Sequence, residues 1–192
     1  WFLTDDILNS KIYYPLEGYL FPDTYYFNGK DVSVKEIFKA MLDKMESVLL
    51  NIKVKENLTT HELLTMASIV ELEGANSNDR AGIAGVFYNR LNNNIQLGSD
   101  VTTYYAAKIE MSDRDLYRSE INAANDYNTR SSHLAGKLPI GPICNPSIKS
   151  IEAVSVLAHP FLNLSKEEYS KIPAEKIRRL QQRPCCWQSP FP

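Results

Sequence analysis

The segment from Thr59 to Gly74 constrains the fold of this 192-residue chain more than any other. Thr59 and Glu62 have the spacing of a capping box, in which a hydroxyl and a carboxylate each accept a hydrogen bond from an otherwise unpaired backbone amide. Glycine commonly follows the last turn of a helix, and Gly74 marks that boundary here. The sequence therefore predicts a helix that opens after Thr59 and closes near Gly74.

Two glutamates lie on different faces of this predicted helix. At roughly 100° per residue, the apolar side chains form one continuous arc, and Glu71 falls inside it, between Ala67 and Leu64. Glu73 lies near the opposite edge of the arc, and the same geometry separates it from Glu71 by roughly 200°. The two carboxyl groups are therefore not expected to act as one catalytic pair.

The position of Glu71 among apolar residues indicates a chemical role. Desolvation disfavours the charged form of a carboxyl group, so we expect the pKa of Glu71 to be raised. A glutamic acid that stays protonated near neutral pH can donate a proton to a glycosidic oxygen. The alternative is that both glutamates are structural, paired with Arg80 or Arg90 or bonded to neighbouring amides. Periodicity alone favours this structural alternative.

Four further helices are predicted from capping residues and helical spacing. A capping box begins residues 33–50, and helical spacing predicts another helix over about residues 80–91. The polar run 112–115 is expected to cap a further helix. The dipeptide 145–146 is expected to begin the last one, with Asn as N-cap and Pro in the first helical position.

The other segments predict extended or irregular structure. Residues 11–27 are rich in Tyr, Phe and Leu but broken by Pro and Gly, which is typical of short extended pieces joined by turns. Residues 95–105 favour extended structure, and residues 127–146 form a long irregular stretch. Helices mixed with extended segments, without regular βαβ alternation, predict an α+β fold.

Composition narrows the classes of function. The net charge of −2 and the lack of a basic face before the tail give no reason to expect nucleic-acid binding. No apolar run approaches the ~20 residues of a membrane helix. Cys144 and the adjacent Cys185 and Cys186 lack metal-ligand spacing, and no metal or cofactor is expected. Because the chain begins at Trp1, we expect it to be a piece of a longer protein.

Four ordered segments carry the most specific signal. They read LEGYLFPDTY at 16–25, ASIVELE at 67–73, LGSDVTTYY at 97–105, and YNTR at 127–130 continued by GKLPIGPICNP at 136–146. Between the second and third, DR at 79–80 and VFYNRL at 86–91 fit the same pattern. Together these segments resemble the endolytic murein transglycosylase family, with its YceG-like domain. Several motifs in one order are far more specific than a single short one.

The resemblance implies a membrane-anchored, extracytoplasmic enzyme of cell-wall biogenesis, with an anchor upstream of this chain. Such an enzyme cleaves the bond between N-acetylmuramic acid and N-acetylglucosamine within nascent peptidoglycan strands and leaves 1,6-anhydro ends. Peptidoglycan synthases are its expected partners. The essential glutamate of the family falls on Glu71. It would protonate the glycosidic oxygen and then take the proton of the muramic acid C6 hydroxyl as that group closes onto C1.

The resemblance also marks positions that would line or brace a substrate groove. They are Glu73, Arg80, Asn89, Arg90, Asp100, Thr102, Tyr127, Asn128 and Thr129. Asp100 and Asn128 rank highest among them. For each residue the alternative is packing or hydrogen bonding that fixes irregular backbone. Tyr104, Tyr105 and Tyr127 could stack on sugar rings, and ordinary tyrosine packing is the alternative.

The extent of the resemblance predicts three parts of the chain. Residues 1–12 would be the end of a truncated LysM-like subdomain, and residues 13–160 the catalytic domain. Residues 161–192 depart from the family, which continues there into an aromatic strand and a Gly-x-His-x-Phe segment. A frameshifted or wrongly joined end, or a lineage-specific tail, would explain that departure.

Other functions fit parts of the sequence. A non-catalytic glycan-binding module would use the same loops and leave Glu71 structural. A hydrolytic muramidase would need a second carboxylate, for which Asp23, Asp100 and Asp126 are the candidates. A pyridoxal-phosphate lyase would need a Schiff-base lysine beside a phosphate cup, and the mid-chain lysines have no such neighbourhood.

Overall fold

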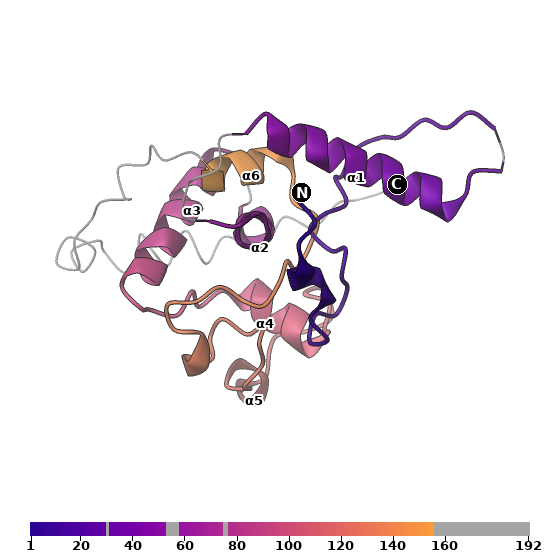
Figure 1. Ribbon diagram of the computed structural model, residues 1–192. Coiled ribbons are helices and arrows are strands. Elements are labelled where there is room, and N and C mark those ends of the chain that lie inside the picture. Colours follow the sequence, from indigo (N-terminus) through magenta and orange to yellow (C-terminus); the bar gives the residue numbers. More distant parts are fainter. Residues whose placement is uncertain (30, 53–57, 75–76, 156–192) are drawn as a thin grey trace.

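The computed structural model describes residues 1–29, 31–52, 58–74 and 77–155, and within these ranges all regular secondary structure is helical (Figure 1). The α-helices are α1 (Val34–Leu50), α2 (Thr60–Glu73), α3 (Ser77–Asn92), α4 (Asp100–Ala107), α5 (Arg118–Ile121) and α6 (Ile148–Ser155). Two 3-10 helices, η1 (Asp5–Leu8) and η2 (Ser132–Leu134), complete the order. The predicted tail 161–192 lies outside the described residues.

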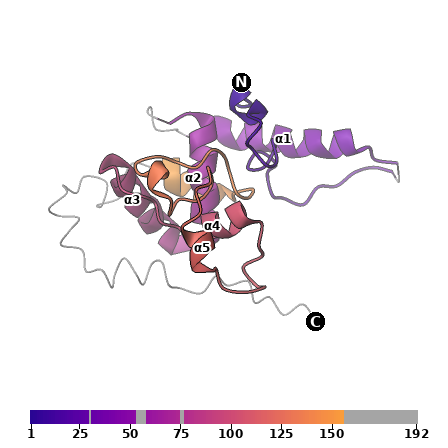
Figure 2. The same ribbon diagram turned by 90° about the horizontal axis from the view of Figure 1, so that it is seen from below.

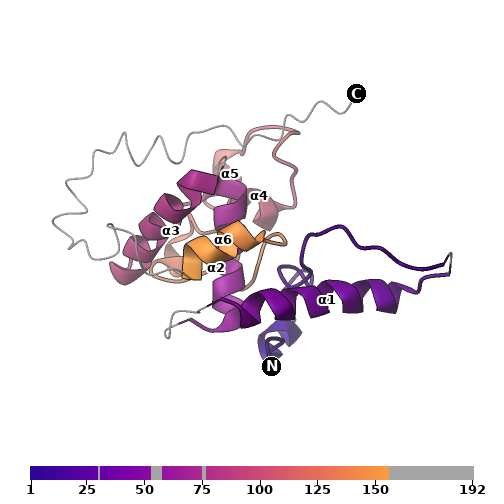
Figure 3. The same ribbon diagram turned by 90° about the horizontal axis from the view of Figure 1, so that it is seen from above.

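The helix α2 is the centre of the fold and is seen nearly end-on in Figure 1. His61 and every residue from Leu63 to Val70 are buried. The helices α3 and α6 pack on α2 and on each other, and α4 contacts α2 as well. Viewed from above, α6 lies across α2 (Figure 3). A helix buried on all sides needs apolar residues around most of its circumference, which explains why the apolar arc of α2 is so broad.

Both predicted capping boxes are present. Ser33 and Glu36 form the first at the start of α1, and Thr59 and Glu62 form the second at the start of α2. The helices predicted over residues 33–50 and 59–74 are thereby confirmed. The helix predicted over residues 80–91 is also present, as the longer α3.

The prediction that residues 95–105 are extended is wrong for their second half, which forms α4. Ser99 has extended backbone at the N-cap position, and Asp100 follows in the first turn, where a negative charge is favourable. The β-branched residues Val101, Thr102 and Thr103 suggested a strand, but all three are buried in the packed interior. Tertiary packing overrides the weak strand preference of such residues.

Two helices begin later than predicted. Residues 112–115 do not cap a helix, and α5 starts at Arg118, where the Glu120 carboxylate accepts a hydrogen bond from the Tyr117 amide at 2.7 Å. Asn145 does not cap α6. Its Oδ1 instead accepts hydrogen bonds from the backbone amides of Gly18 and Leu20, at 2.8 Å and 3.3 Å.

The strands required by the α+β prediction are absent from the described residues. The aromatic segment 11–27 buries two of its rings, Tyr19 and Phe21, without forming a strand, and the Phe21 amide donates to the carbonyl of Met41 on α1. Residues 127–146 form the irregular stretch that was predicted, interrupted by η2. Local hydrogen bonds and buried rings thus replace sheet pairing in these segments.

The long helix α1 joins the core only near its C-terminal end. Met45, Val48 and Leu49 are its buried residues, whereas Val34 in the first turn is 67% exposed. Figure 2 shows the N-terminal part of α1 extending away from the other helices. None of the described helices has the length and apolar character that crossing a bilayer requires.

Candidate active site

The carboxylate of Glu71 is held by donors from two other parts of the chain. Its Oε2 accepts hydrogen bonds from the Ser147 amide at 2.9 Å, the Ser147 hydroxyl at 2.6 Å and the Ser150 hydroxyl at 2.7 Å. Its Oε1 accepts one from Nη2 of Arg80 at 2.8 Å. We call these four residues the Glu71 cluster.

The arrangement of three helices places this cluster. Glu71 lies in the last turn of α2, Arg80 in the first turns of α3, and Ser147 directly before α6. The first amides of a helix lack partners within the helix and favour a negative charge, so the start of α6 suits a carboxylate. Ser150 is three residues beyond Ser147, and that spacing brings both hydroxyls to one side of the α6 start.

The prediction that the pKa of Glu71 is raised is wrong. Burial acts to raise it, since the side chain is only 22% exposed. The hydrogen bonds from Ser147 and Ser150 and the positive charge of Arg80 outweigh burial, so the pKa of Glu71 lies below its ordinary value. The contact with Arg80 confirms the ion pair that the structural alternative anticipated.

Glu73 is the carboxyl group of α2 whose pKa is raised. Burial is the main cause, and the nearby negative charge of Asp100 adds to it. The hydroxyl of Ser99 donates a hydrogen bond to Oε1 of Glu73 at 2.5 Å. Glu71 and Glu73 therefore have different partners and opposite pKa shifts, in keeping with the helical geometry that separated them.

Two further predicted site residues, Asp100 and Arg90, lie near Glu73 together with Arg130, which was not predicted. The charges of Asp100, Arg130 and Arg90 all act on its pKa. Asp100 forms an ion pair with Arg130, and Nη1 of Arg90 donates a hydrogen bond to the carbonyl of Leu97. Glu73 and these charged side chains therefore gather where α2, α3 and α4 meet.

Three of the predicted residues brace the chain around α4. Thr102 and Thr129 are fully buried, and their hydroxyls lie 2.7 Å apart. The amide of Ser99 donates to the Thr129 hydroxyl at 3.0 Å. Asn128 is also fully buried, and its side chain bonds both to the hydroxyl of Thr103 and to backbone carbonyls of residues 120–123. Asn89, on α3, is likewise buried.

The tyrosines pack on one another. Tyr127 is 1% exposed, and its ring centroid lies 4.7 Å from that of Tyr13 and 4.8 Å from that of Tyr105. The Tyr127 hydroxyl accepts a hydrogen bond from the Tyr13 amide at 3.3 Å. The Tyr104 hydroxyl donates to the carbonyl of Arg114 at 3.2 Å. These contacts are those of ordinary tyrosine packing.

The structure thus divides the predicted residues between the two ends of α2. Glu71 with Arg80, and Glu73 with Arg90 and Asp100, lie at its C-terminal end. Tyr127 lies by its N-terminal end, because a Cβ added to Gly141 would be 3.5 Å from the Tyr127 hydroxyl and 3.6 Å from the ring of His61. Among the described residues, no three His, Cys, Asp or Glu side chains gather as a metal site requires.

Ser147 and Ser150 were not predicted from the sequence, although they supply three of the four hydrogen bonds to Glu71. The available signal was a serine directly after Pro146, followed by another three residues later. That pattern indicates a helix start that can bind an anion, but it does not say which carboxylate is bound.

Comparison with known proteins places the chain in a family. Residues 3–163 match the YceG-like family. The chain belongs to that family. A protein named endolytic murein transglycosylase from Bacillus subtilis (strain 168) is 43% identical over 154 residues, which are 79% of this chain and 41% of the relative. A relative of the same name from Streptococcus pneumoniae (strain ATCC BAA-255 / R6) is 39% identical over 153 residues, 77% of this chain and 27% of the relative.

The fold of this YceG-like chain matches a solved structure. A crystal structure of a YceG-like protein from Listeria monocytogenes superposes with a TM-score of 0.69 and 34% identity, covering 86% of this chain and 55% of that one. The predicted resemblance and the YceG-like fold are confirmed. The chain spans 41% and 27% of the length of the two curated relatives.

Proposed function

We propose that this chain is the catalytic part of a lytic transglycosylase that cuts peptidoglycan strands internally. The bond cleaved joins N-acetylmuramic acid to N-acetylglucosamine, and the product carries a 1,6-anhydro end. The observation that carries the proposal is the Glu71 cluster. In this cluster four hydrogen bonds orient Glu71, the residue on which the resemblance puts the essential glutamate, where three helices meet. The names of two relatives at 43% and 39% identity support the same activity.

Glu71 would act as both acid and base. Its carboxylate form, which the cluster favours, suits the step in which the C6 hydroxyl of muramic acid loses its proton while closing onto C1. The preceding step needs a proton on Glu71 for the glycosidic oxygen. A bound glycan would cover the 22% of the side chain that is exposed, and excluding water raises the pKa of a carboxyl group. We therefore expect activity to rise toward acidic pH.

Other residues of the site would support this reaction in two ways. Asp100 and Arg130 have side chains that are 53% and 37% exposed, and they would contact the glycan strand beyond Glu73. The buried polar residues would keep the surrounding backbone rigid instead of touching substrate. These bracing residues are Asn89, Thr102, Asn128 and Thr129.

A hydrolytic muramidase would need a second carboxylate beside Glu71, but each of the three candidates pairs with a cation that is not part of the Glu71 cluster. Asp23 is paired with Lys44 at 3.3 Å, and Asp126 with Lys11 at 2.8 Å. Asp100 is paired with Arg130. Each of these carboxylates thus has a cationic partner outside the Glu71 cluster. An intramolecular nucleophile needs no second carboxylate to activate water.

The reaction is tested by incubating the chain with purified peptidoglycan and analysing the released muropeptides by mass spectrometry. Glu71→Gln is compared with Glu152→Gln, which changes an exposed glutamate on α6. Anhydro products from the native chain and Glu152→Gln, but not from Glu71→Gln, support the proposal. Products heavier by one water would establish a muramidase. Binding without cleavage by all three folded chains would establish a glycan-binding module.

The location of the substrate belongs to the same proposal. Nascent peptidoglycan lies outside the cytoplasmic membrane, so residues 13–160 would work there as the catalytic domain of an anchored protein. Peptidoglycan synthases, which make the strand, are the partners such a position would bring close. Cross-linking of the full-length protein in intact cells tests both points.

A further inference from the structure

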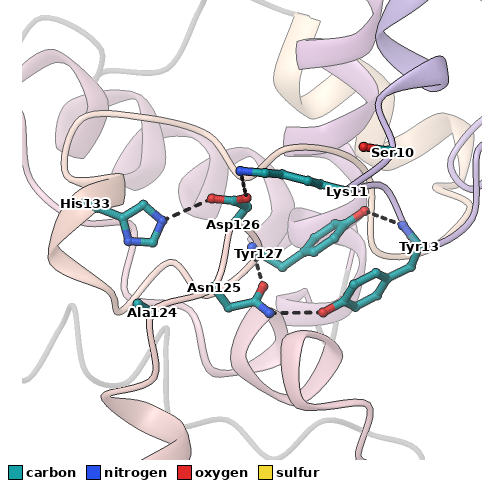
Figure 4. A pocket seen from close by; sticks show the side chains of 8 residues that line it. All are labelled: Ser10, Lys11, Tyr13, Ala124, Asn125, Asp126, Tyr127 and His133. Atoms are coloured by element: carbon teal, nitrogen blue, oxygen red, sulfur yellow. Dashed lines mark hydrogen bonds and ion pairs between the residues drawn. The ribbon is translucent and has the colours of Figure 1, made fainter.

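A pocket of about 570 Å³ lies between the N-terminal segment and the loop that precedes η2. It is lined by Ser10, Lys11, Tyr13, Ala124, Asn125, Asp126, Tyr127 and His133, as Figure 4 shows. Its volume falls within the range of roughly 300–1,000 Å³ that is typical of small-ligand sites. The reaction proposed above uses none of its charged residues.

The pocket lies at the far end of α2 from Glu71. The backbone carbonyl of Asp126 accepts a hydrogen bond from the Ile140 amide at 3.1 Å, and the carbonyl of Ile140 bonds to Nε2 of His61 at 2.8 Å. His61 is in the first turn of α2 and Glu71 in its last. Ten residues of helix separate them by about 15 Å, at ~1.5 Å per residue. A single sugar ring does not reach both places, but a polymeric strand can.

Hydrogen bonds hold the tyrosine wall of the pocket in place. The Tyr13 hydroxyl donates to the carbonyl of Ala106 at 3.1 Å and accepts from Nδ2 of Asn125 at 3.0 Å. The amide of Tyr127 in turn donates to Oδ1 of Asn125 at 2.8 Å. Polar groups that are already fixed lose little freedom when a ligand binds, so this wall is pre-organised.

The charges of the pocket are paired. Figure 4 shows Lys11 reaching across to Asp126, with His133 on the other side of the carboxylate. The distances to Asp126 are 2.8 Å from Lys11 and 3.4 Å from His133. These side chains are 67% exposed for Lys11, 42% for His133 and 37% for Asp126. An exposed ion pair is weak, so its groups can turn toward ligand hydroxyls at little cost.

This lining fits a neutral, hydroxyl-rich ligand with an apolar side. Lys11, Asn125 and Asp126 offer donors and acceptors for hydroxyl and acetamido groups, and the partly exposed Tyr13 and the exposed Ala124 offer apolar surface. A free peptide carboxylate would call for an uncompensated cation, whereas Asp126 already balances Lys11. We propose that the pocket is a second saccharide site, which holds an N-acetylated sugar of the glycan strand at a distance from Glu71. This inference rests on the proposed function.

The site is tested by isothermal titration of the chain with the neutral tetramer of N-acetylglucosamine. Asp126→Ala and Lys11→Ala are compared with Asp43→Ala, which removes an exposed aspartate that is likewise paired with a lysine, Lys39 on α1. Because a hydrogen bond to a charged group is lost, we expect the dissociation constant to rise about tenfold in both pocket variants. Asp43→Ala should bind like the native chain. Both pocket substitutions change exposed side chains, and circular dichroism confirms that the variants are folded.

Equal affinity in all four chains would overturn the inference, as would no binding by the native chain. Displacement of the tetramer by a free stem peptide would also overturn it and assign the pocket to peptide. The anhydro-muropeptide assay separates this outcome from the proposed reaction. If binding depends on the pocket but no anhydro products form, the saccharide site is supported and the proposed transglycosylase reaction is contradicted. If anhydro products form but binding does not depend on the pocket, the reaction is supported and the saccharide site is contradicted.

Discussion

The hydroxyl of Ser150 lies 2.7 Å from Oε2 of Glu71 and donates a hydrogen bond to it. A hydrogen bond donated to a carboxylate favours the charged form, so this contact helps to hold the pKa of Glu71 down. Ser150→Ala should raise that pKa and shift the alkaline limb of the pH–rate profile upward by about one unit. The profile is measured from the release of anhydro-muropeptides.

The control for this prediction is Ser155→Ala, on the same helix. The hydroxyl of Ser155 donates to the carbonyl of Glu152 at 3.0 Å and not to Glu71. It should leave the pH profile in place. An unshifted alkaline limb in Ser150→Ala would show that the hydroxyl has only a structural role.

Glu73→Gln should stabilise the chain at high pH. Because the folded-state pKa of Glu73 is raised, its contribution to stability is fully present below the ordinary pKa and is lost as pH rises through the raised value. Glutamine stays neutral and can still accept the hydrogen bond from Ser99. The Tm of the variant should therefore match that of the native chain at about pH 4 and exceed it at about pH 8. A Tm difference that does not change with pH, as expected for Glu152→Gln, would contradict this.

Asn128→Ala should destabilise the chain strongly. The amide nitrogen of Asn128 donates to three carbonyls of residues 120–123, at distances from 2.8 Å to 3.3 Å, and its Oδ1 accepts from the Thr103 hydroxyl at 2.8 Å. Truncation leaves buried polar groups without partners, so we expect the free energy of unfolding to fall by about 2–4 kcal/mol. Urea denaturation measures it. Asn122→Ala, at an exposed position in the same loop, should cost far less.

Alanine substitutions at two glycines with positive φ distinguish the cost of a steric clash from the cost of backbone strain. Gly18 has φ +85°, and a Cβ there would lie 2.4 Å from the ring of Pro142. Gly29 has φ +109°, and a Cβ there would meet no heavy atom within 4 Å. Both alanine variants carry the strain of a left-handed backbone, about 1–2 kcal/mol. Gly18→Ala should lose about a further 1–3 kcal/mol in urea denaturation because of the clash. Equal losses would contradict this account.

The features that could be predicted from sequence are local ones. The capping boxes at Ser33 and Thr59 place donor and acceptor within three residues, so their spacing alone identifies them. The opposite faces of Glu71 and Glu73 follow from helical geometry alone. The ordered motifs identified the family because they record sequence similarity directly and require no knowledge of packing.

The features that were missed depend on contacts between distant residues. The pKa of Glu71 was predicted from the side chains of its own helix alone. The serines that lower this pKa lie 76 and 79 residues further along the chain. Asn145 has the spacing of an N-cap, yet its side chain bonds to Gly18 and Leu20, which come 127 and 125 positions earlier in the chain. Residues 101–103 prefer strands, and burial in the interior makes them helical.

The separation between Glu71 and its serine partners also governs when the site can form during synthesis. As the chain is made from its N-terminus, Glu71 appears 76 residues before Ser147. Until α6 has been made and docked, the carboxylate lacks three of its four hydrogen bonds. Contacts between residues so far apart form late in folding, because closing the intervening loop is costly. While those 76 residues are being made, the Glu71 cluster would therefore remain incomplete.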